Sequence, residues 1–203
     1  MKINKLLVTT QKEIFENISQ RFTLEEVPQE SQFQVHFGQN NITEEDENII
    51  LVYISNITDI SWLEYIQENY LFEKVVFLGY AMSELNFDLK EGDVIMPNSF
   101  ISGDSSEKGI FLEYAVGKNY DLTQFGLILS GICYSSENIT SETIQKLQED
   151  GIDVYDSGVF SILTTLKKQE LLDKTVVMQG VLSDKTKTTV TCKNLLQILE
   201  ITL

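Results

Sequence analysis

Basic residues are scarce in this sequence. Its 203 residues include 15 Lys or Arg and 31 Asp or Glu, which gives a formal net charge of −16 and an isoelectric point near 4.3. Proteins bind a phosphate backbone through cationic side chains that neutralise the phosphates. The charge therefore argues against nucleic acid as a partner.

Histidine and cysteine are scarcer still. His36 is the only histidine, and the two cysteines, Cys133 and Cys192, lie in apolar stretches of sequence. A structural zinc site takes four ligands, usually Cys or His, and these three residues cannot supply them. We expect no metal and no other cofactor. The two cysteines are expected to be small core residues rather than a disulfide pair.

Long apolar runs are also missing. No segment approaches the ~20 apolar residues that a helix needs to span a bilayer, and residues 1–8 hold too short an apolar stretch for a signal peptide. These absences favour a soluble, cytoplasmic protein without membrane contact. With 42% hydrophobic residues the chain is not of the disordered class. Its length fits one domain over residues 1–203.

The order of apolar and amphipathic segments predicts an α/β fold. Apolar or alternating runs predict strands over residues 3–8, 33–37, 49–54, 74–78, 94–96, 111–116, 125–133, 152–155 and 175–182. Helical spacing predicts helices over residues 11–22, 140–150, 157–168 and 186–199, and one that begins at Thr58 or Asp59. Apolar strands that alternate with helices are typical of a parallel sheet covered on both faces. We therefore expect a three-layer α/β/α domain around a mostly parallel, twisted sheet.

Polar or small residues follow three of the predicted strands. They occupy residues 9–13, 79–83 and 183–185. In open α/β sheets ligands bind beyond the carboxyl ends of the strands, so these segments are candidates for a site. Residues of the same kind also cap helices, and for Asp184 a capping or loop role is the simpler interpretation of the sequence alone.

Three segments, in order, resemble the nucleoside phosphorylase and nucleosidase superfamily. The first is VVFLGYAMSELNFDLKEGDVI at residues 75–95, where members carry an apolar strand, a Gly-x-Ala-Gly-Gly-type loop and a Gly-Asp-Val-Val segment. The second is GLILSG at 126–131 followed by VYDSG at 154–158, and the third is VVMQGVLSD at 176–184. The resemblance is closest to the 5′-methylthioadenosine/S-adenosylhomocysteine nucleosidases.

This resemblance implies a homodimer that acts on a small-molecule nucleoside. Cleavage of an N-ribosidic bond passes through an oxocarbenium-like sugar, so an acid protonates the leaving base and a base activates water. By resemblance Asp184 is the acid, donating to a purine ring nitrogen, and Ser183 positions it. Glu13 falls where nucleosidases keep the carboxylate that activates water. The implied activity is hydrolysis of a purine nucleoside or thionucleoside.

The resemblance also implies a substrate-binding set. Tyr155 and Asp156 occupy the place of the family's Met-Glu pair, whose carboxylate accepts hydrogen bonds from ribose hydroxyls. Gly79, Tyr80 and Ala81 occupy the loop after the strand, and Tyr80, Tyr155 and Phe160 are candidates to stack on a base. Two simpler roles stay open, because Glu13 can be a first-turn acid of a helix and Asp156 a helix cap.

The sequence departs from the family's pattern in several places. Ala81-Met82-Ser83 replaces Ala-Gly-Gly, Asp156 is one methylene shorter than Glu, and a glycine-rich loop expected around residues 35–45 is missing. Phosphorylases of the superfamily grip phosphate with arginines, and Arg21 is the only arginine. Hydrolysis is therefore favoured over phosphorolysis. The alternative is a non-catalytic member that binds nucleosides or acts through protein partners.

Overall fold

The computed structural model contains the five expected helices. It describes residues 2–28, 33–40, 47–86, 88–107, 109–113, 126–183 and 189–202. Within these residues the α-helices are α1 (Lys12–Arg21), α2 (Ser61–Asn69), α3 (Ser141–Glu149), α4 (Val159–Lys168) and α5 (Thr189–Thr202). A 3₁₀ turn, η2 (Leu172–Lys174), precedes the last strand. Each helix lies where the spacing of apolar residues predicts one.

The strands of the described residues form one mixed sheet. They are β1 (Lys2–Thr9), β2 (Glu25–Glu26), β3 (Phe33–Asn40), β4 (Glu47–Ile54), β5 (Leu71–Met82), β6 (Val94–Ile95), β7 (Ser99–Ser102), β8 (Ile110–Phe111), β9 (Leu127–Ile128), β10 (Ile132–Ser135), β11 (Val154–Asp156) and β12 (Thr175–Leu182). The main order is β2-β3-β4-β1-β5-β11-β10-β7-β8, and β12 pairs with β5 and β6.

The centre of the sheet is parallel. β1 runs parallel to β4 and to β5, and β5 runs parallel to β12 along eight residue pairs, among them Gly79 with Gln179. The carboxyl ends of β1, β5 and β12 therefore lie at the same edge. Antiparallel pairs are confined to β2–β3, β3–β4, β5–β11, β6–β12 and β7–β8.

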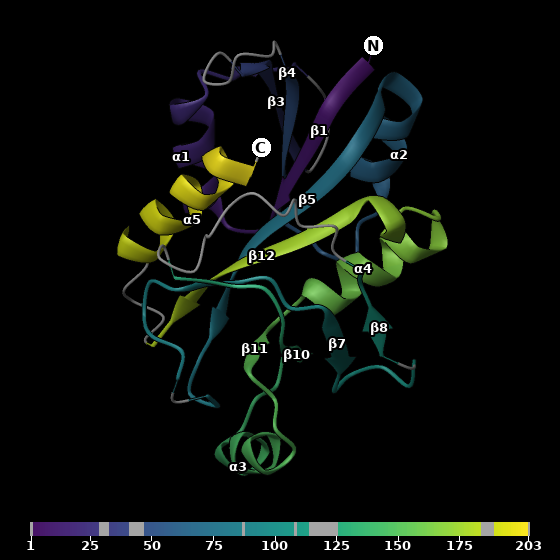
Figure 1. Ribbon diagram of the computed structural model, residues 1–203. Helices are drawn as coiled ribbons and strands as arrows, with labels where there is room; N and C mark the ends of the chain where they lie inside the picture. The colour runs from purple at the N-terminus through teal and green to yellow at the C-terminus, as the bar shows by residue number, and fades with distance from the viewer. Residues whose placement is uncertain are drawn as a thin grey trace.

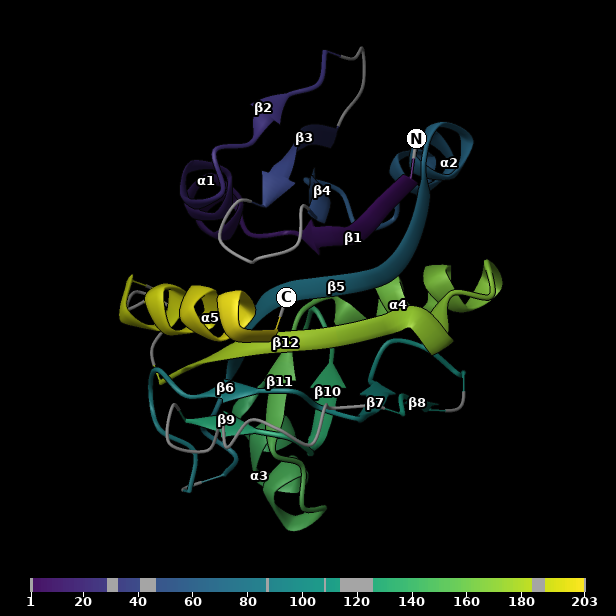
Figure 2. The same ribbon diagram turned by 45° about the horizontal axis from the view of Figure 1, so that its top comes forward.

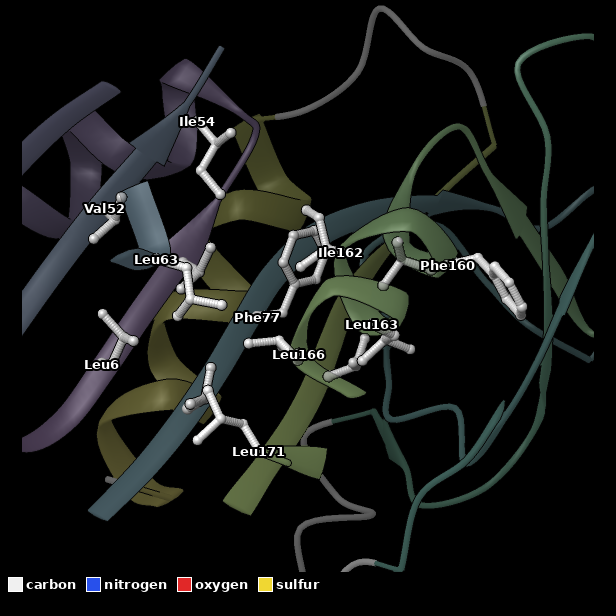
Figure 3. Close-up of a cluster of buried hydrophobic side chains, with 14 of the residues drawn as sticks. Leu6, Val52, Ile54, Leu63, Phe77, Phe160, Ile162, Leu163, Leu166 and Leu171 are labelled. Carbon is white, nitrogen blue, oxygen red and sulfur yellow. The ribbon is translucent and has the colours of Figure 1, made fainter. Parts of the chain in front are cut away.

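Helices cover both faces of this sheet. α1 and α5 lie over one face and α2 and α4 over the other (Figures 1 and 2). Figure 3 shows the core beneath α4, where Ile162, Leu163 and Leu166 pack toward Phe77 of β5 and Leu63 of α2. The opposite core joins α1 and α5 to the strands through residues such as Ile14 and Leu195. The three-layer α/β/α prediction is confirmed.

Helix α3 lies in the connection between β10 and β11 and stands apart from both helical layers (Figure 1). Thr140 caps it, because its hydroxyl accepts the N–H of Thr143 at 3.2 Å. Gly151 follows the helix with a φ of 71°, a left-handed conformation that glycine adopts without strain. Both ends agree with the prediction for residues 140–150.

Two predicted strands differ from the structure. The apolar run 125–133 is not one strand, because residues 129–131 interrupt it between β9 and β10. The segment 127–135 pairs with β6 through β9 and with β7 through β10. At the change of partner, the Gly131 carbonyl accepts the N–H groups of Asn98 and Ser99 at 3.1 and 3.2 Å. Of the predicted strand 111–116, β8 contains only Phe111, and residues 114–116 lie outside the described part.

Of two predictions about particular residues, the helix cap at Asp59 was partly right and the buried free cysteines are confirmed. Asp59 helps to begin α2, since its Oδ1 accepts the N–H of Ser61 at 2.9 Å, although Ile60 is the residue at the cap position. Cys133 and Cys192 are both buried free thiols. Among the described helices, none is long and apolar enough to cross a membrane.

Candidate functional site

A cavity of about 350 Å³ lies at the edge of the sheet where β5 and β12 end. We call it the edge cavity. Apolar and aromatic side chains form much of its wall: Tyr80, Ala81, Met82, Ile139, Tyr155 and Leu182. The rest of the lining comes from Gln11, Ser136, Glu137, Asp156 and Ser157.

A second cavity of about 180 Å³ lies beside the first, next to the start of α4. We call it the inner cavity. It shares Gln11, Tyr80, Asp156 and Ser157 with the edge cavity, and adds Thr10, Ile57, Phe77, Gly79, Gly158, Val159 and Gln179. Gly79 stands opposite Gln179 in the β5–β12 register. The absence of a side chain at Gly79 leaves space beside Gln179, and an added Cβ there would lie 3.0 Å from the Phe77 ring.

Asp156 lies between the two cavities, and protein donors surround its carboxylate. Oδ1 accepts the Ser135 hydroxyl at 2.6 Å and the N–H groups of Gly158 and Val159 at 2.8 and 3.1 Å. Oδ2 accepts Gln179 Nε2 at 2.5 Å and the Cys133 thiol at 3.3 Å. Burial, together with the neighbouring Asp156 charge, raises the pKa of Cys133 well above its usual value.

These bonds bear out the helix-cap alternative in part, because Gly158 and not Asp156 is the residue at the cap position of α4. The Asp156 carboxylate still accepts the N–H groups of Gly158 and Val159, which have no partner within the helix. A carboxylate offers about four lone-pair positions, and five donors already approach this one. The arrangement leaves little capacity for a ligand hydroxyl.

Gln179 is the residue of this site that sequence reasoning missed. Its side chain is 1% exposed and lies on β12 among apolar residues. Nε2 donates to Asp156, whereas Oε1 is buried and has no hydrogen-bond partner in the described part of the chain. A polar residue inside the run 175–182 was the signal that could have identified it.

Glu13 and Tyr80 come together on the opposite face of the sheet. Glu13 is half-buried in the first turn of α1, and Tyr80 projects from β5 toward α1 and α5. Burial raises the pKa of Tyr80, with smaller contributions from the Cys192 thiol and the Glu13 carboxylate. The Tyr80 hydroxyl forms no hydrogen bond of ordinary geometry among the described residues. A buried phenol donor thus stands unpaired near Glu13.

The remaining binding residues are divided between the cavity wall and other places. Tyr155 and Ala81 line the edge cavity, and burial followed by the nearby Glu84 carboxylate raises the pKa of Tyr155 to about 12. Phe160 is buried in the core beneath α4 and lines neither the edge cavity nor the inner cavity (Figure 3). Of the three aromatic candidates, Tyr80 and Tyr155 line the edge cavity.

The end of β12 is described only as far as Ser183. Its side chain is exposed, and the hydroxyl donates to the Glu91 carboxylate, so Ser183 does not line either cavity. Asp184 lies outside the described residues. Leu182, two residues before it, lines the edge cavity.

The segment that reaches the cavities after β4 lies outside residues 35–45, where the family's glycine-rich loop is expected. Gly38 lies in β3, paired with Ile49, and residues 41–46 are outside the described part. The segment after β4 instead brings Ile57 to the inner cavity. Arg21 is bound to Glu200 between α1 and α5, and no Lys or Arg lines either cavity among the described residues.

Comparison with known proteins gives similarity in structure and none in sequence. No family model matches the chain, and no curated protein does. The native futalosine hydrolase of Helicobacter pylori superposes with a TM-score of 0.71 at 18% identity, covering 99% of this chain and 96% of that one.

Two further structures are similar over most of their length. A mutant 5′-methylthioadenosine/S-adenosylhomocysteine nucleosidase of H. pylori, with 5′-methylthioadenosine in its active site, gives a TM-score of 0.70 at 17% identity and covers 99% of this chain and 100% of its own. The P. knowlesi homologue of P. falciparum PNP gives 0.73 at 13%, covering 99% and 88%. The chain therefore has the fold of the nucleoside phosphorylase and nucleosidase structures.

Proposed function

We propose that this protein is an N-ribosyl hydrolase that cleaves the glycosidic bond of a purine nucleoside or thionucleoside. The observation that carries the proposal is the pair of adjacent cavities at the carboxyl edge of β5 and β12. Ligands of open α/β sheets bind at this edge. The larger cavity, with Tyr80 and Tyr155 in its wall, suits a planar base, and the smaller one has Thr10 and Gln179 in its lining.

The lining favours water over phosphate as the second substrate. Neither cavity is lined by Lys or Arg in the described residues, and Glu137 and Asp156 are their acidic side chains. The N–H groups at the start of α4, which could bind an anion, already donate to Asp156. Phosphorolysis needs a cationic grip on phosphate, whereas hydrolysis does not.

The proposed catalytic groups are Asp184, Ser183 and Glu13, as the resemblance assigns them. Asp184 protonates the leaving base, and Ser183, anchored to Glu91, fixes the chain just before it. Glu13 activates the attacking water from the α1 side. Asp156 belongs to the sugar-binding region, while Tyr155, Gly79, Tyr80 and Ala81 shape the surface against which the nucleoside binds.

The resemblance also carries the proposal of a homodimer of single-domain subunits. Large apolar side chains are exposed on strands β7 and β8 near one end of the sheet, namely Ile101 and Phe111. A second copy of the chain would remove them from water. Sedimentation at micromolar concentration tests this, and a pure monomer contradicts it.

The second candidate is a nucleoside-binding protein without catalysis. It is favoured by Met82, which lines the edge cavity at a position where the family carries glycine. A panel of adenosine, inosine, 5′-methylthioadenosine, S-adenosylhomocysteine and futalosine separates the two candidates. Release of free base supports the hydrolase, calorimetric binding without release supports the binding protein, and absence of both removes both candidates.

Asp184 provides the sharpest test of the mechanism. Asp184→Asn keeps the shape of the side chain but has no acidic proton, so turnover should fall by ~10²–10⁴-fold while nucleoside binding persists. If Asp184 only caps α5, Asn caps nearly as well as Asp, and Asp184→Ala loses about 1 kcal/mol of stability. Full activity of Asp184→Asn, in a preparation that hydrolyses nucleosides, removes Asp184 from the mechanism.

A further inference from the structure

Gln179 occupies an unusual position for a polar side chain. It lies in a central strand between Met178 and Gly180, and only 1% of it is exposed. Buried polar groups in folded proteins are almost always hydrogen-bonded. The Nε2 group of Gln179 satisfies this rule, whereas Oε1 does not, because Oε1 has no hydrogen-bond partner among the described residues.

The orientation of the amide is fixed by its neighbour. An ionised carboxylate only accepts hydrogen bonds, so the Gln179 atom that lies 2.5 Å from Asp156 Oδ2 must be the NH₂ group. Rotating the amide by 180° would set two acceptors against each other. The atom without a partner among the described residues is therefore Oε1, which can accept a hydrogen bond.

Asp156, in contrast, has little room for another donor. Ser135 and the two N–H groups of Gly158 and Val159 occupy Oδ1, and only the weak Cys133 thiol shares Oδ2 with Gln179. A ligand hydroxyl that contacted Asp156 would have to displace one of these groups. A hydroxyl that contacted Gln179 Oε1 would displace nothing.

The surroundings of Gln179 indicate which part of a nucleoside supplies that donor. Gln179 lines the inner cavity, together with Thr10 and Gln11, and faces the space left by Gly79. Apolar residues such as Phe77 also line the inner cavity, but the edge cavity has the wider apolar and aromatic wall. A base is the less polar and flatter part of a nucleoside, and the sugar is the part that carries hydroxyls.

We propose that Gln179 Oε1 accepts a hydrogen bond from a sugar hydroxyl of the bound nucleoside, and that Asp156 is a positioning residue that holds the Gln179 amide and the start of α4. This inference rests on the proposed nucleoside site. It moves the direct sugar contact from Asp156, to which the resemblance assigns it, to Gln179.

The test compares substrates that differ by one hydroxyl. kcat/KM, or Kd where no turnover occurs, is measured for adenosine, 2′-deoxyadenosine and 3′-deoxyadenosine. The wild type should favour adenosine over one deoxynucleoside by roughly 10–100-fold, since a site built for a hydroxyl is left with an unpaired acceptor without it. In Gln179→Met that ratio should fall to within about threefold. An unchanged ratio in Gln179→Met overturns the proposal.

Controls separate this contact from other effects. Gln145→Met makes the same change on the exposed surface of α3 and should keep the wild-type ratio. If Gln179→Met does not fold, Gln179→Asn retracts the amide by one methylene and should also lose the ratio. Purine riboside, which lacks the exocyclic amine of adenosine, tests the base. A Gln179→Met effect on adenosine against purine riboside, with the sugar ratio intact, assigns the contact to the base and overturns the proposal.

The inference and the proposed function can fail separately. Wild-type protein that binds or hydrolyses adenosine while Gln179→Met discriminates sugars normally contradicts the inference alone. Wild-type protein that neither binds nor hydrolyses any nucleoside removes both.

Discussion

Two carboxylates stand on opposite faces of the sheet near the same edge, and their surroundings differ. Asp156, on the α4 face, is approached by five protein donors. Glu13, on the α1 face, lies near a buried Tyr80 hydroxyl that forms no hydrogen bond of ordinary geometry among the described residues.

The difference separates a carboxylate with a structural role, Asp156, from one that we propose acts in catalysis, Glu13. A fully bonded carboxylate fixes the elements around it, here β10, β11, β12 and the start of α4. Buried polar groups without a hydrogen-bond partner cost stability unless a ligand or a water molecule pairs with them. Unpaired atoms near Glu13 and at Gln179 therefore mark where a ligand or water can complete the structure. The predictions below test this contrast between Asp156 and Glu13.

The largest effect is expected on catalysis at Glu13. If Glu13 activates water, Glu13→Gln should lower turnover by ~10²–10⁴-fold, because the amide cannot accept the proton. Its thermal stability should change little, since an acid in the first turn of an exposed helix end contributes only ~0.3–1 kcal/mol. Glu16→Gln, on the exposed side of the same helix, is the matched control and should keep full activity. Wild-type turnover in Glu13→Gln would limit Glu13 to a helix-end role.

The next effect is expected on stability at Asp156. Asp156→Ala leaves Gln179, Ser135 and two backbone N–H groups without their acceptor, at a cost of about 3 kcal/mol or more in the free energy of unfolding. For a chain of this length that corresponds to a fall of ~6–12 °C in Tm. Asp59→Ala, which removes one bond to the Ser61 N–H at the surface, should cost only ~1 kcal/mol. Equal losses from the two variants would contradict the architectural role of Asp156.

A smaller effect of opposite sign is expected at Tyr80. Tyr80→Phe removes a buried hydroxyl that forms no hydrogen bond of ordinary geometry among the described residues, so the free energy of unfolding should stay constant or rise by up to ~1 kcal/mol. Tyr155→Phe, whose hydroxyl lies beside Glu84, should give no gain. Chemical denaturation measures both. A clear loss of stability in Tyr80→Phe would mean that the hydroxyl is paired in solution, and the contrast with Asp156 would disappear.

The smallest effect concerns the attachment of α1, which carries Glu13. Ser19 of α1 and Nδ1 of His36 in β3 lie 2.5 Å apart, and burial lowers the pKa of His36 below its usual 6.5, although Glu26 opposes the shift. As the pH falls, His36 therefore binds a proton in the unfolded chain before it does so in the folded protein. The stability that neutral His36 contributes is fully present above pH 6.5, and it is lost as the pH falls from 6.5 through the pKa of His36 in the folded protein.

A comparison of Tm between pH 7.5 and pH 5 tests the His36 prediction. His36→Gln keeps a polar side chain but does not titrate, so its Tm should fall less over this range than that of the wild type. Parallel curves for the two proteins would show that His36 does not contribute to the pH dependence.

Much of the architecture followed from local patterns. Helical spacing located all five helices because each buries one apolar face, as Ile14 and Ile18 do on α1. Apolar strands such as 49–54 and the nearly continuous 175–182 indicated a sheet covered on both sides. The polar residues after three of the strands indicated the edge where a cavity lies. The broken strand at 129–131 could not be predicted, because it depends on where β6 and β7 lie.

The sequence by itself thus determined the layers, the helices and the edge of the sheet that holds the cavities. Only the tertiary structure decided that Asp156 is bonded to Cys133, Ser135 and Gln179, that Ser183 turns to Glu91, and that Gln179 keeps a free acceptor. The physical reason is that periodicity reports which face of an element is buried. The partners of a buried polar atom come from segments far apart in the chain, and their positions are set by how those segments pack.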